Sequence, residues 1–139
     1  MFDEIDLRNK KVYFAVPKHS FNDPLVERGY QLIKSQKPLE ILDARNLFKS
    51  NEEWAKTGLA YLDDCDVMII SSFNHSVGKG VFLEYIYFKE NVSNNIFFYL
   101  ESYHGRRDIK ENFFQKFIQV TKLKIVDQDN WSYYAKVEY

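Results

Sequence analysis

The sequence predicts one doubly wound α/β domain over residues 1–139, built on a five-stranded parallel sheet. A chain of 139 residues is about one domain long. With 45% hydrophobic and 28% charged residues, it can form one core and lacks the composition of a disordered chain. Short apolar runs alternate with stretches whose apolar residues recur at helical spacing. This alternation is typical of right-handed crossovers between parallel strands, with helices covering both faces of the sheet.

The first half of the chain begins this alternation with a buried strand. Residues 12–16 (VYFAV) form an apolar run that stops at Pro17. A helix follows, capped by Asn22 or Asp23, with Pro24 in its first turn. It ends before Pro38. The next expected elements are a strand at residues 39–42 leading to Asp43, a helix at 52–62 and a strand at 67–70.

The second half continues the pattern with a more aromatic composition. Gly78 and Gly80 punctuate the loop after the third strand. The expected elements are a helix at residues 81–90, a fourth strand at 96–100, a helix at 109–120 and a weak fifth strand at 123–126, followed by an aromatic tail at 131–139. Aromatic residues make up 17% of the chain, which favours a crowded core over a flat surface that meets another subunit.

Charge and cysteine content exclude several classes of protein. Nineteen Lys and Arg residues against twenty Asp and Glu residues leave a net charge of -1, so nucleic-acid binding is not expected. The single cysteine, Cys65, excludes an internal disulfide or a multi-cysteine metal site and suits a reducing cytoplasm. The chain starts without a signal-like segment, and its apolar runs are too short to span a membrane. We therefore expect a cytoplasmic protein without a metal ion or other cofactor.

Ligands of doubly wound sheets bind beyond the carboxyl ends of the strands, near the point where strand order reverses. The loops to search are therefore residues 17–23, 43–51, 71–80 and 101–108. The third of these offers hydroxyls, a lysine and two glycines in front of a helix N-terminus, where backbone N–H groups can bind an anion. A plain surface turn explains this loop about equally well, and its spacing is not that of a P-loop.

Glu84 is the strongest candidate for a nucleophile. It lies one turn into the helix that follows this loop, so its carboxylate could project toward the strand ends. Carboxylates can attack an anomeric carbon and form a glycosyl-enzyme intermediate. The alternative is a solvated glutamate favoured by the helix dipole.

Other polar residues give weaker signals. Three acidic residues precede the third strand and are more typical of a solvated turn than of a metal site: Asp63, Asp64 and Asp66. The histidines fall in three separate loops without metal-ligand spacing: His19, His75 and His104. Cys65 has no redox or metal pattern around it and is interpreted as a packed thiol.

Several segments together resemble the nucleoside 2-deoxyribosyltransferase superfamily, which includes the deoxynucleoside 5′-monophosphate N-glycosidases. The segments are VYFAVP at residues 12–17, LDDCDVMII at 62–70, SVGKGVFLE at 76–84 and the short aromatic C-terminus ending in Tyr139. Together they cover most of the domain.

The resemblance implies a flavodoxin-like domain that binds a nucleoside or nucleotide at its strand ends. It implies cleavage or exchange of the N-glycosidic bond, with Glu84 attacking C1′, Tyr13 beside the sugar and residues 76–80 forming a sugar or phosphate loop. It also implies a homodimer or larger homo-oligomer. The residues expected at the substrate are Tyr13, Pro17, His19, Asp43, Ser76, Gly78, Gly80 and Tyr139.

The sequence departs from the superfamily's pattern in ways that leave the function open. Gly58 and Gly78 stand where the superfamily usually has acidic or hydroxyl residues. With a long loop after the third strand, Glu84 aligns with the catalytic glutamate. With a short loop, Phe82 aligns with it instead, and the protein would be catalytically inactive. Without a proton-handling partner, Glu84 could act slowly, recruit Asp43 or His19, or belong to a catalytically inactive protein that binds a nucleotide or its derivative.

Two further alternatives concern the aromatic residues. The tail at residues 130–139 could complete the site of a neighbouring subunit or pack on its own domain. A protein-interaction module without a small-molecule site is a third functional class, supported by composition alone.

Overall fold

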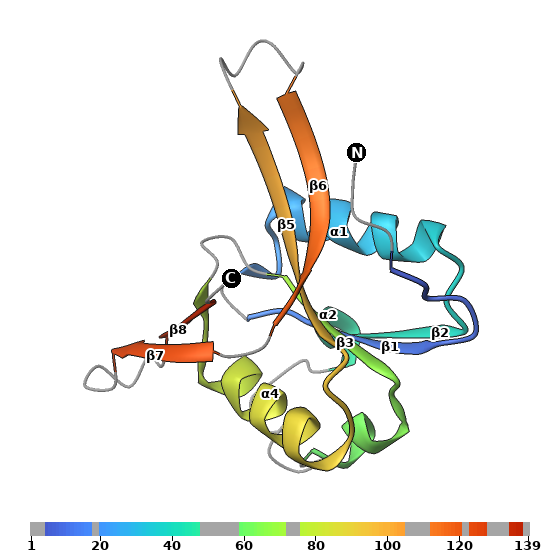
Figure 1. Cartoon of the computed structure of the whole chain (residues 1–139), viewed down its shortest axis with the longest axis vertical. Coiled ribbons are helices and arrows are strands. Elements are labelled where there is room, and N and C mark those ends of the chain that lie inside the picture. Colours follow the sequence, from blue (N-terminus) through green and yellow to red (C-terminus); the bar gives the residue numbers. More distant parts are fainter. Residues whose placement is uncertain are drawn as a thin grey trace.

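A five-stranded sheet forms the centre of the computed structural model, which describes residues 5–17, 20–47, 59–71, 76–104, 112–120, 123–127 and 134–137 (Figure 1). The strand order is β2–β1–β3–β5–β6. The first four run parallel to their neighbours, and β6 runs antiparallel to β5. The strands are β1 (Lys11–Ala15), β2 (Glu40–Asp43), β3 (Val67–Ile70), β5 (Ile96–His104) and β6 (Asn112–Gln119).

The two central strands, β1 and β3, are continuous apolar runs because both faces of the sheet are covered. Residues 12–15 and 67–70 are all buried. Alternate residues point to opposite faces of a strand, so Tyr13 and Ala15 join one core cluster while Val12 and Phe14 join the other. The strands predicted at residues 12–16 and 67–70 are therefore confirmed.

One helix packs against each of these clusters. Helix α1 (Pro24–Ser35) contributes Val26 and Ile33 to the cluster that contains Phe14. Helix α4 (Lys79–Asn91) contributes Val81, Tyr85 and Phe88 to the cluster that contains Tyr13, together with Leu62 of the short 3₁₀ helix η2 (Ala60–Asp64). The structure is thus a mixed α/β fold with a mostly parallel sheet and a helix on each face.

Helix α1 begins as its sequence predicts. Asp23 is the N-cap, and its Oδ1 accepts a hydrogen bond of 2.8 Å from the backbone N–H of Leu25. Pro24 occupies the first turn, where its missing N–H costs no hydrogen bond. The helix ends at Ser35, and Lys37 then adopts a left-handed conformation with φ of 58° before Pro38.

The prediction of a helix at residues 109–120 is wrong. Residues 112–119 form β6, which pairs with β5 from Phe97↔Gln119 to His104↔Asn112, while residues 109–111 lie outside the described part. The phenylalanines in this segment recur at helical spacing, but aromatic residues also favour strands, and pairing with a neighbouring strand decides between the two. The sheet is therefore not fully parallel.

The predicted strand at residues 123–126 exists but belongs to a second sheet. Strand β7 (Leu123–Asp127) pairs antiparallel with β8 (Tyr134–Val137), and β8 pairs antiparallel with β4 (Ser76–Val77). The C-terminal part of the chain thus packs beside the segment that leads into α4 (Figure 1). This finding supports, for residues 134–137, the alternative in which the tail lies on its own domain.

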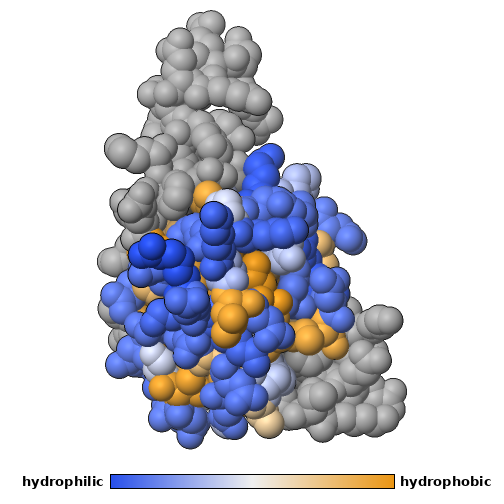
Figure 2. Space-filling view, turned by 90° about the vertical axis from the view of Figure 1, so that its right-hand side faces the viewer, coloured by the Kyte–Doolittle hydropathy of each residue, from blue (hydrophilic) through white to orange (hydrophobic). Residues whose placement is uncertain are grey.

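The remaining predicted elements agree in part with the structure. The predicted second strand is β2, shifted by one residue, and it leads into the four-residue helix α2 (Ala44–Leu47). Most of the predicted helix at residues 52–62 lies outside the described residues, and its end is the 3₁₀ helix η2. Within the described part of the chain, every helix is too short or too polar to cross a bilayer. Hydrophilic residues predominate on the face shown in Figure 2, with a smaller group of apolar residues among them.

Candidate functional site

The carboxyl ends of β1 and β3 lie side by side at the centre of the sheet. The N–H of Ser71, directly after β3, donates a hydrogen bond of 2.9 Å to the carbonyl of Ala15, the last residue of β1. Strand β1 has β2 on one side and β3 on the other, so the chain order reverses here. Pro17, predicted at the substrate, follows β1 and is buried.

Glu84 is buried against the sheet rather than solvated. Only 3% of its surface is exposed, although it lies on a helix that borders solvent. Its Oε2 accepts hydrogen bonds from the hydroxyls of Tyr13 on β1 and Tyr61 on η2. Hydroxyl donors stabilise a carboxylate's charge, whereas burial opposes it. The interpretation of Glu84 as a solvated first-turn glutamate is therefore wrong.

Tyr13 supplies the deeper of these two hydroxyls. Its side chain is fully buried at the centre of β1. Burial raises the pKa of Tyr13 well above its ordinary value, and the nearby charge of Glu84 and the hydroxyl of Tyr61 raise it further. The Tyr13 hydroxyl therefore stays protonated and remains a hydrogen-bond donor at neutral pH.

Tyr61 supplies the second hydroxyl from a different element and is only partly buried. Its ring lies 5.3 Å from the ring of Tyr13, centroid to centroid, at an interplanar angle of 47°. The two rings form an aromatic wall beside Glu84. Sequence analysis missed Tyr61, because nothing in the local sequence indicates that η2 folds back onto α4.

The structure also places Phe82, the alternative residue for the nucleophile position. Residues two apart on a helix point about 200° apart. Phe82 is partly exposed and packs against Tyr85, with ring centroids 6.4 Å apart. Glu84 is the residue of this helix whose carboxylate accepts the hydrogen bond from Tyr13.

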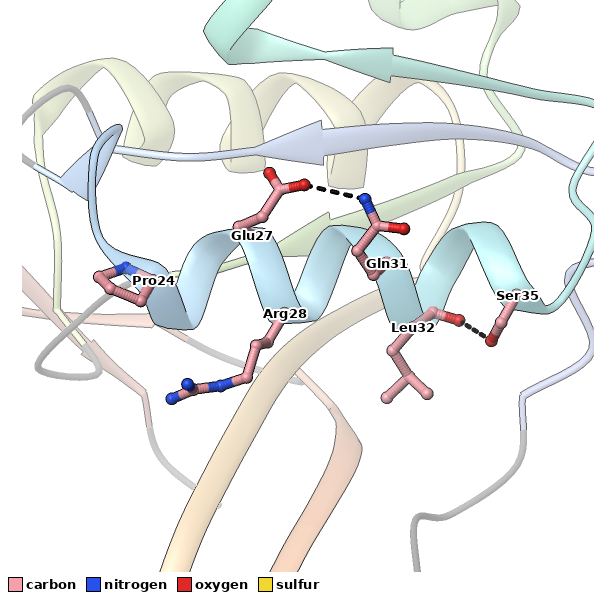
Figure 3. A pocket seen from close by; sticks show the side chains of 6 residues that line it. All are labelled: Pro24, Glu27, Arg28, Gln31, Leu32 and Ser35. Atoms are coloured by element: carbon pink, nitrogen blue, oxygen red, sulfur yellow. Dashed lines mark hydrogen bonds between the residues drawn. The ribbon is translucent and has the colours of Figure 1, made fainter.

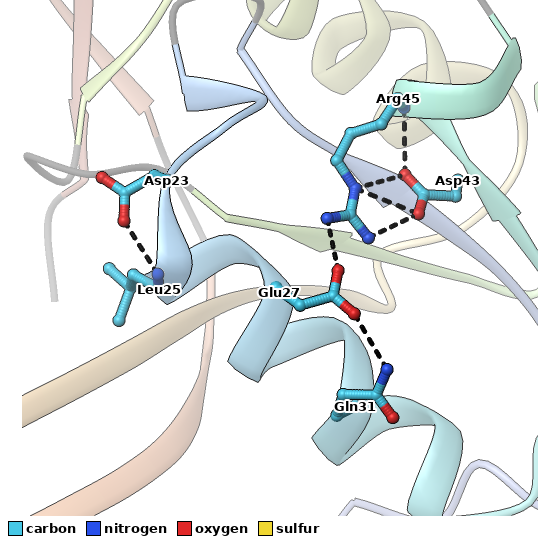
Figure 4. A network of polar contacts seen from close by, with 6 residues as sticks. All are labelled: Asp23, Leu25, Glu27, Gln31, Asp43 and Arg45. Carbon is cyan, nitrogen blue, oxygen red and sulfur yellow. Dashed lines mark hydrogen bonds and ion pairs between the residues drawn. The ribbon is translucent and has the colours of Figure 1, made fainter.

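Asp43, predicted to contact substrate, is held by Arg45 instead (Figure 4). The Arg45 guanidinium donates to both Asp43 carboxylate oxygens, at 3.1 Å from Nε and 2.8 Å from Nη2. Its Nη1 reaches Glu27 of α1 at 2.7 Å, and its carbon Cζ lies over the rings of Phe14 and Tyr30. This network joins β2, α2 and α1.

The negative charge of Asp43 is compensated by the guanidinium of Arg45. Asp43 is 5% exposed and the side chain of Arg45 is 16% exposed, so water screens the pair weakly. The pKa of Arg45 is raised, first by the hydrogen bond to the Asp43 carboxylate and further by Glu27, although burial opposes the shift. Asp43 is therefore a structural ion-pair partner in this structure.

The predicted sugar or phosphate loop is described in part. Ser76 lies in β4, where its backbone pairs with Lys136, and Gly78 is the N-cap of α4 in an extended conformation. Gly80 is exposed in the first turn of α4. Because Gly78 has no side chain, no side-chain hydrogen bond caps the helix. His19, His75 and Tyr139 lie outside the described residues.

Two buried hydroxyls at the strand ends add to the site. Ser20 follows β1 and is 1% exposed, and Ser71 follows β3 and is fully buried. Neither Oγ has a hydrogen-bond partner among the residues that the structure describes. A buried hydroxyl without a partner costs about 1–3 kcal/mol, so these positions favour an additional polar group, such as water, near the end of the sheet.

The other candidate residues have structural roles. Asp66 accepts a hydrogen bond of 2.9 Å from the backbone N–H of Lys11, and Asp63 accepts one of 2.7 Å from the hydroxyl of Tyr87. Asp63, Asp64 and Asp66 are exposed, in agreement with a solvated turn. Cys65 is buried, and this burial raises its thiol pKa to about 11, in agreement with a packed thiol.

A separate groove of about 650 Å³ runs along the outer side of α1 (Figure 3). None of the described residues that were predicted at the substrate lines it. The lining residues that the structure describes are Pro24, Glu27, Arg28, Gln31, Leu32 and Ser35.

Comparison of the chain with protein-family models, curated proteins and solved structures finds no match.

Proposed function

We propose that this protein cleaves or exchanges the N-glycosidic bond of a nucleoside, a deoxynucleoside or a nucleoside 5′-monophosphate, with Glu84 as the nucleophile. The observation that carries the proposal is the buried contact between Glu84 of α4 and Tyr13 of the central strand β1. Hydroxyl donors fix the orientation of a buried carboxylate and offset part of the cost of burying its charge. Attack on an anomeric carbon requires both effects.

The position of Glu84 in the fold supports the same proposal. The strand order and the helices on the two faces favour a doubly wound, flavodoxin-like arrangement, with the reversal between β1 and β3. Ligands bind at such reversals. Glu84, Tyr13 and the unpartnered hydroxyl of Ser71 all belong to elements that meet there.

A second candidate function is binding without turnover. It is favoured by the ion pair between Asp43 and Arg45, because this pair withdraws Asp43 from proton transfer at Glu84. General acid–base groups typically contribute about 10²–10⁴-fold in rate. A protein with this fold and without such a group would bind a nucleotide or a nucleotide derivative and release nothing.

Chromatographic detection of free base tests the first proposal. The substrates are deoxynucleosides, ribonucleosides and their 5′-monophosphates, each with and without a second base as acceptor. Glu84→Gln is the preferred variant, because its amide oxygen can still accept the tyrosine hydrogen bonds. Glu90→Gln is the matched control, since Glu90 is exposed on the same helix.

Release or exchange by the wild type and Glu90→Gln, lost in Glu84→Gln, is the expected result. Equal release by Glu84→Gln would remove Glu84 from the mechanism. If the wild type releases no base, calorimetric titration with the same compounds tests the second candidate function. Saturable binding would support binding without turnover. No binding would contradict both candidate functions.

The proposal extends to assembly as a homo-oligomer. Residues 134–137 of the tail pair with β4 of the same chain. We therefore propose that the subunits associate while these residues stay paired within their own subunit. Analytical ultracentrifugation of the full chain measures the oligomeric state, and a monomer at all concentrations would contradict this part.

A further inference from the structure

The two tyrosines that donate to Glu84 differ in their access to solvent. Tyr13 is fully buried in the central strand, whereas Tyr61 is partly buried on a short 3₁₀ helix near the surface. Both hydroxyls donate to the same carboxylate oxygen, Oε2. The carboxylate therefore has a rigid donor beneath it and a second donor on a separate, more accessible element.

We propose that Tyr61 is a positioning residue that orients Glu84 for attack, while Tyr13 anchors it to the sheet. The inference rests on the proposed function, because attack by Glu84 is the step that this orientation serves. The hydrogen bond from Tyr13 holds Oε2 from the side of β1. The hydrogen bond from Tyr61 reaches the same oxygen from a different element, η2, and so further restricts the rotation of the carboxylate plane.

The proposed step needs no proton from Tyr61. A carboxylate oxygen of Glu84 forms a bond to C1′, the C1′–N bond breaks, and its electron pair stays on the base nitrogen. Water or a second base then attacks C1′ and releases the carboxylate. Whether water or a second base attacks, the proton that the attacking molecule loses balances the proton that the departing base gains. Tyr61 keeps its proton throughout and acts by fixing the nucleophile.

The chain contains a matched control for the structural role of this contact. The hydroxyl of Tyr87, on α4, donates to Asp63 Oδ1, on η2, at 2.7 Å. This bond joins the same two elements as the bond between Tyr61 and Glu84, and it does so without touching Glu84. Tyr61→Phe and Tyr87→Phe each remove one hydroxyl between η2 and α4.

Steady-state kinetics of the two variants test the positioning role. Misplacement of a reacting group by about 1 Å can cost about 10²-fold in rate. We expect Tyr61→Phe to lower kcat by about 10- to 100-fold and to change KM by no more than about twofold. The acid limb of the pH–rate profile should move to higher pH, because the Glu84 carboxylate loses a hydrogen-bond donor. Tyr87→Phe is expected to leave both unchanged. Equal effects in the two variants would overturn the proposal, because they would show that Tyr61 merely joins the two elements.

Infrared difference spectroscopy tests the contact without any substrate. The wild type minus Glu84→Gln spectrum isolates the carboxylate stretch of Glu84. We expect Tyr61→Phe to shift this band and Tyr87→Phe to leave it in place, with urea unfolding confirming that both variants fold. An unshifted band in Tyr61→Phe would overturn the inference. A shifted band in a protein that releases no base would instead refute the proposed activity, and with it the catalytic purpose of the contact.

Discussion

Gly29 of α1 lies directly against the ring of Tyr99 on β5. A Cβ atom at residue 29 would lie 2.9 Å from Cδ1 of Tyr99, closer than carbon atoms approach in proteins. Tyr99 cannot easily move, because it is 1% exposed and its ring packs 5.6 Å from the ring of Phe117. This contact sets how closely the helix approaches the sheet.

Gly29→Ala should therefore destabilise the protein, although alanine is the better helix former. Overpacking costs about 1–3 kcal/mol, more than the helix propensity that alanine adds. The matched variant is Gly80→Ala, in the first turn of α4, where an added Cβ meets nothing within 4 Å. It should leave the free energy of unfolding unchanged or raise it by up to about 1 kcal/mol. Urea unfolding measures both, and equal effects would contradict the described packing.

Arg45→Ala should be much more costly than removal of an exposed arginine. It leaves the buried carboxylate of Asp43 unpaired, and breaking a buried pair costs about 3 kcal/mol or more. Arg8 pairs with Asp6 at 3.2 Å, but the two side chains are 76% and 65% exposed. Arg8→Ala should therefore lower the free energy of unfolding far less than Arg45→Ala does. Chemical denaturation of both variants makes the comparison, and similar losses would show that the Asp43 carboxylate is solvated.

The raised pKa of Tyr13 predicts a loss of stability in alkaline solution. The folded state holds the Tyr13 proton more tightly than the unfolded chain, in which tyrosine ionises near pH 10. Its contribution is thus fully present below about pH 10 and decreases as the pH rises further. Tyr13→Phe should show a smaller decrease than the wild type. Unfolding midpoints measured from pH 8 to 11 test this, and parallel curves for the two proteins would contradict it.

Cys65 should react slowly with thiol reagents in the folded protein. Burial raises its pKa from 9.0 to about 11, so the thiolate fraction at pH 8 falls about 100-fold before access is considered. Labelling with a disulfide reagent, with and without urea, measures the difference. A folded-state rate close to that of the unfolded chain would show that Cys65 is exposed by frequent local opening.

Much of the fold follows from local patterns in the sequence. Residues 67–70 are all apolar, because a central strand that is covered on both faces buries every side chain. Asp23 and Pro24 mark the start of α1 because capping and first-turn chemistry involve only neighbouring residues. These elements are determined by local sequence and depend little on contacts with distant residues.

The errors arise where distant partners decide. Phe113, Phe114 and Phe117 satisfy a helical period, but pairing with β5 makes their segment a strand. Glu84 was singled out from its place on a helix, whereas its contact with Tyr61 depends on how η2 folds back. Asp43 ends a strand as a ligand residue would, yet it pairs with Arg45, which Glu27 of the distant helix α1 also holds.

The pairing of β4 with β8 also bears on the order in which the chain folds during synthesis. Ser76 lies opposite Lys136, so about sixty further residues must leave the ribosome before β4 can find its partner. At about 5–20 residues per second this takes several seconds, during which β1, β2 and β3 can already associate. The strand that precedes Gly78 and α4 is thus completed late, and a nascent chain would form its central strands before it forms the full surroundings of Glu84.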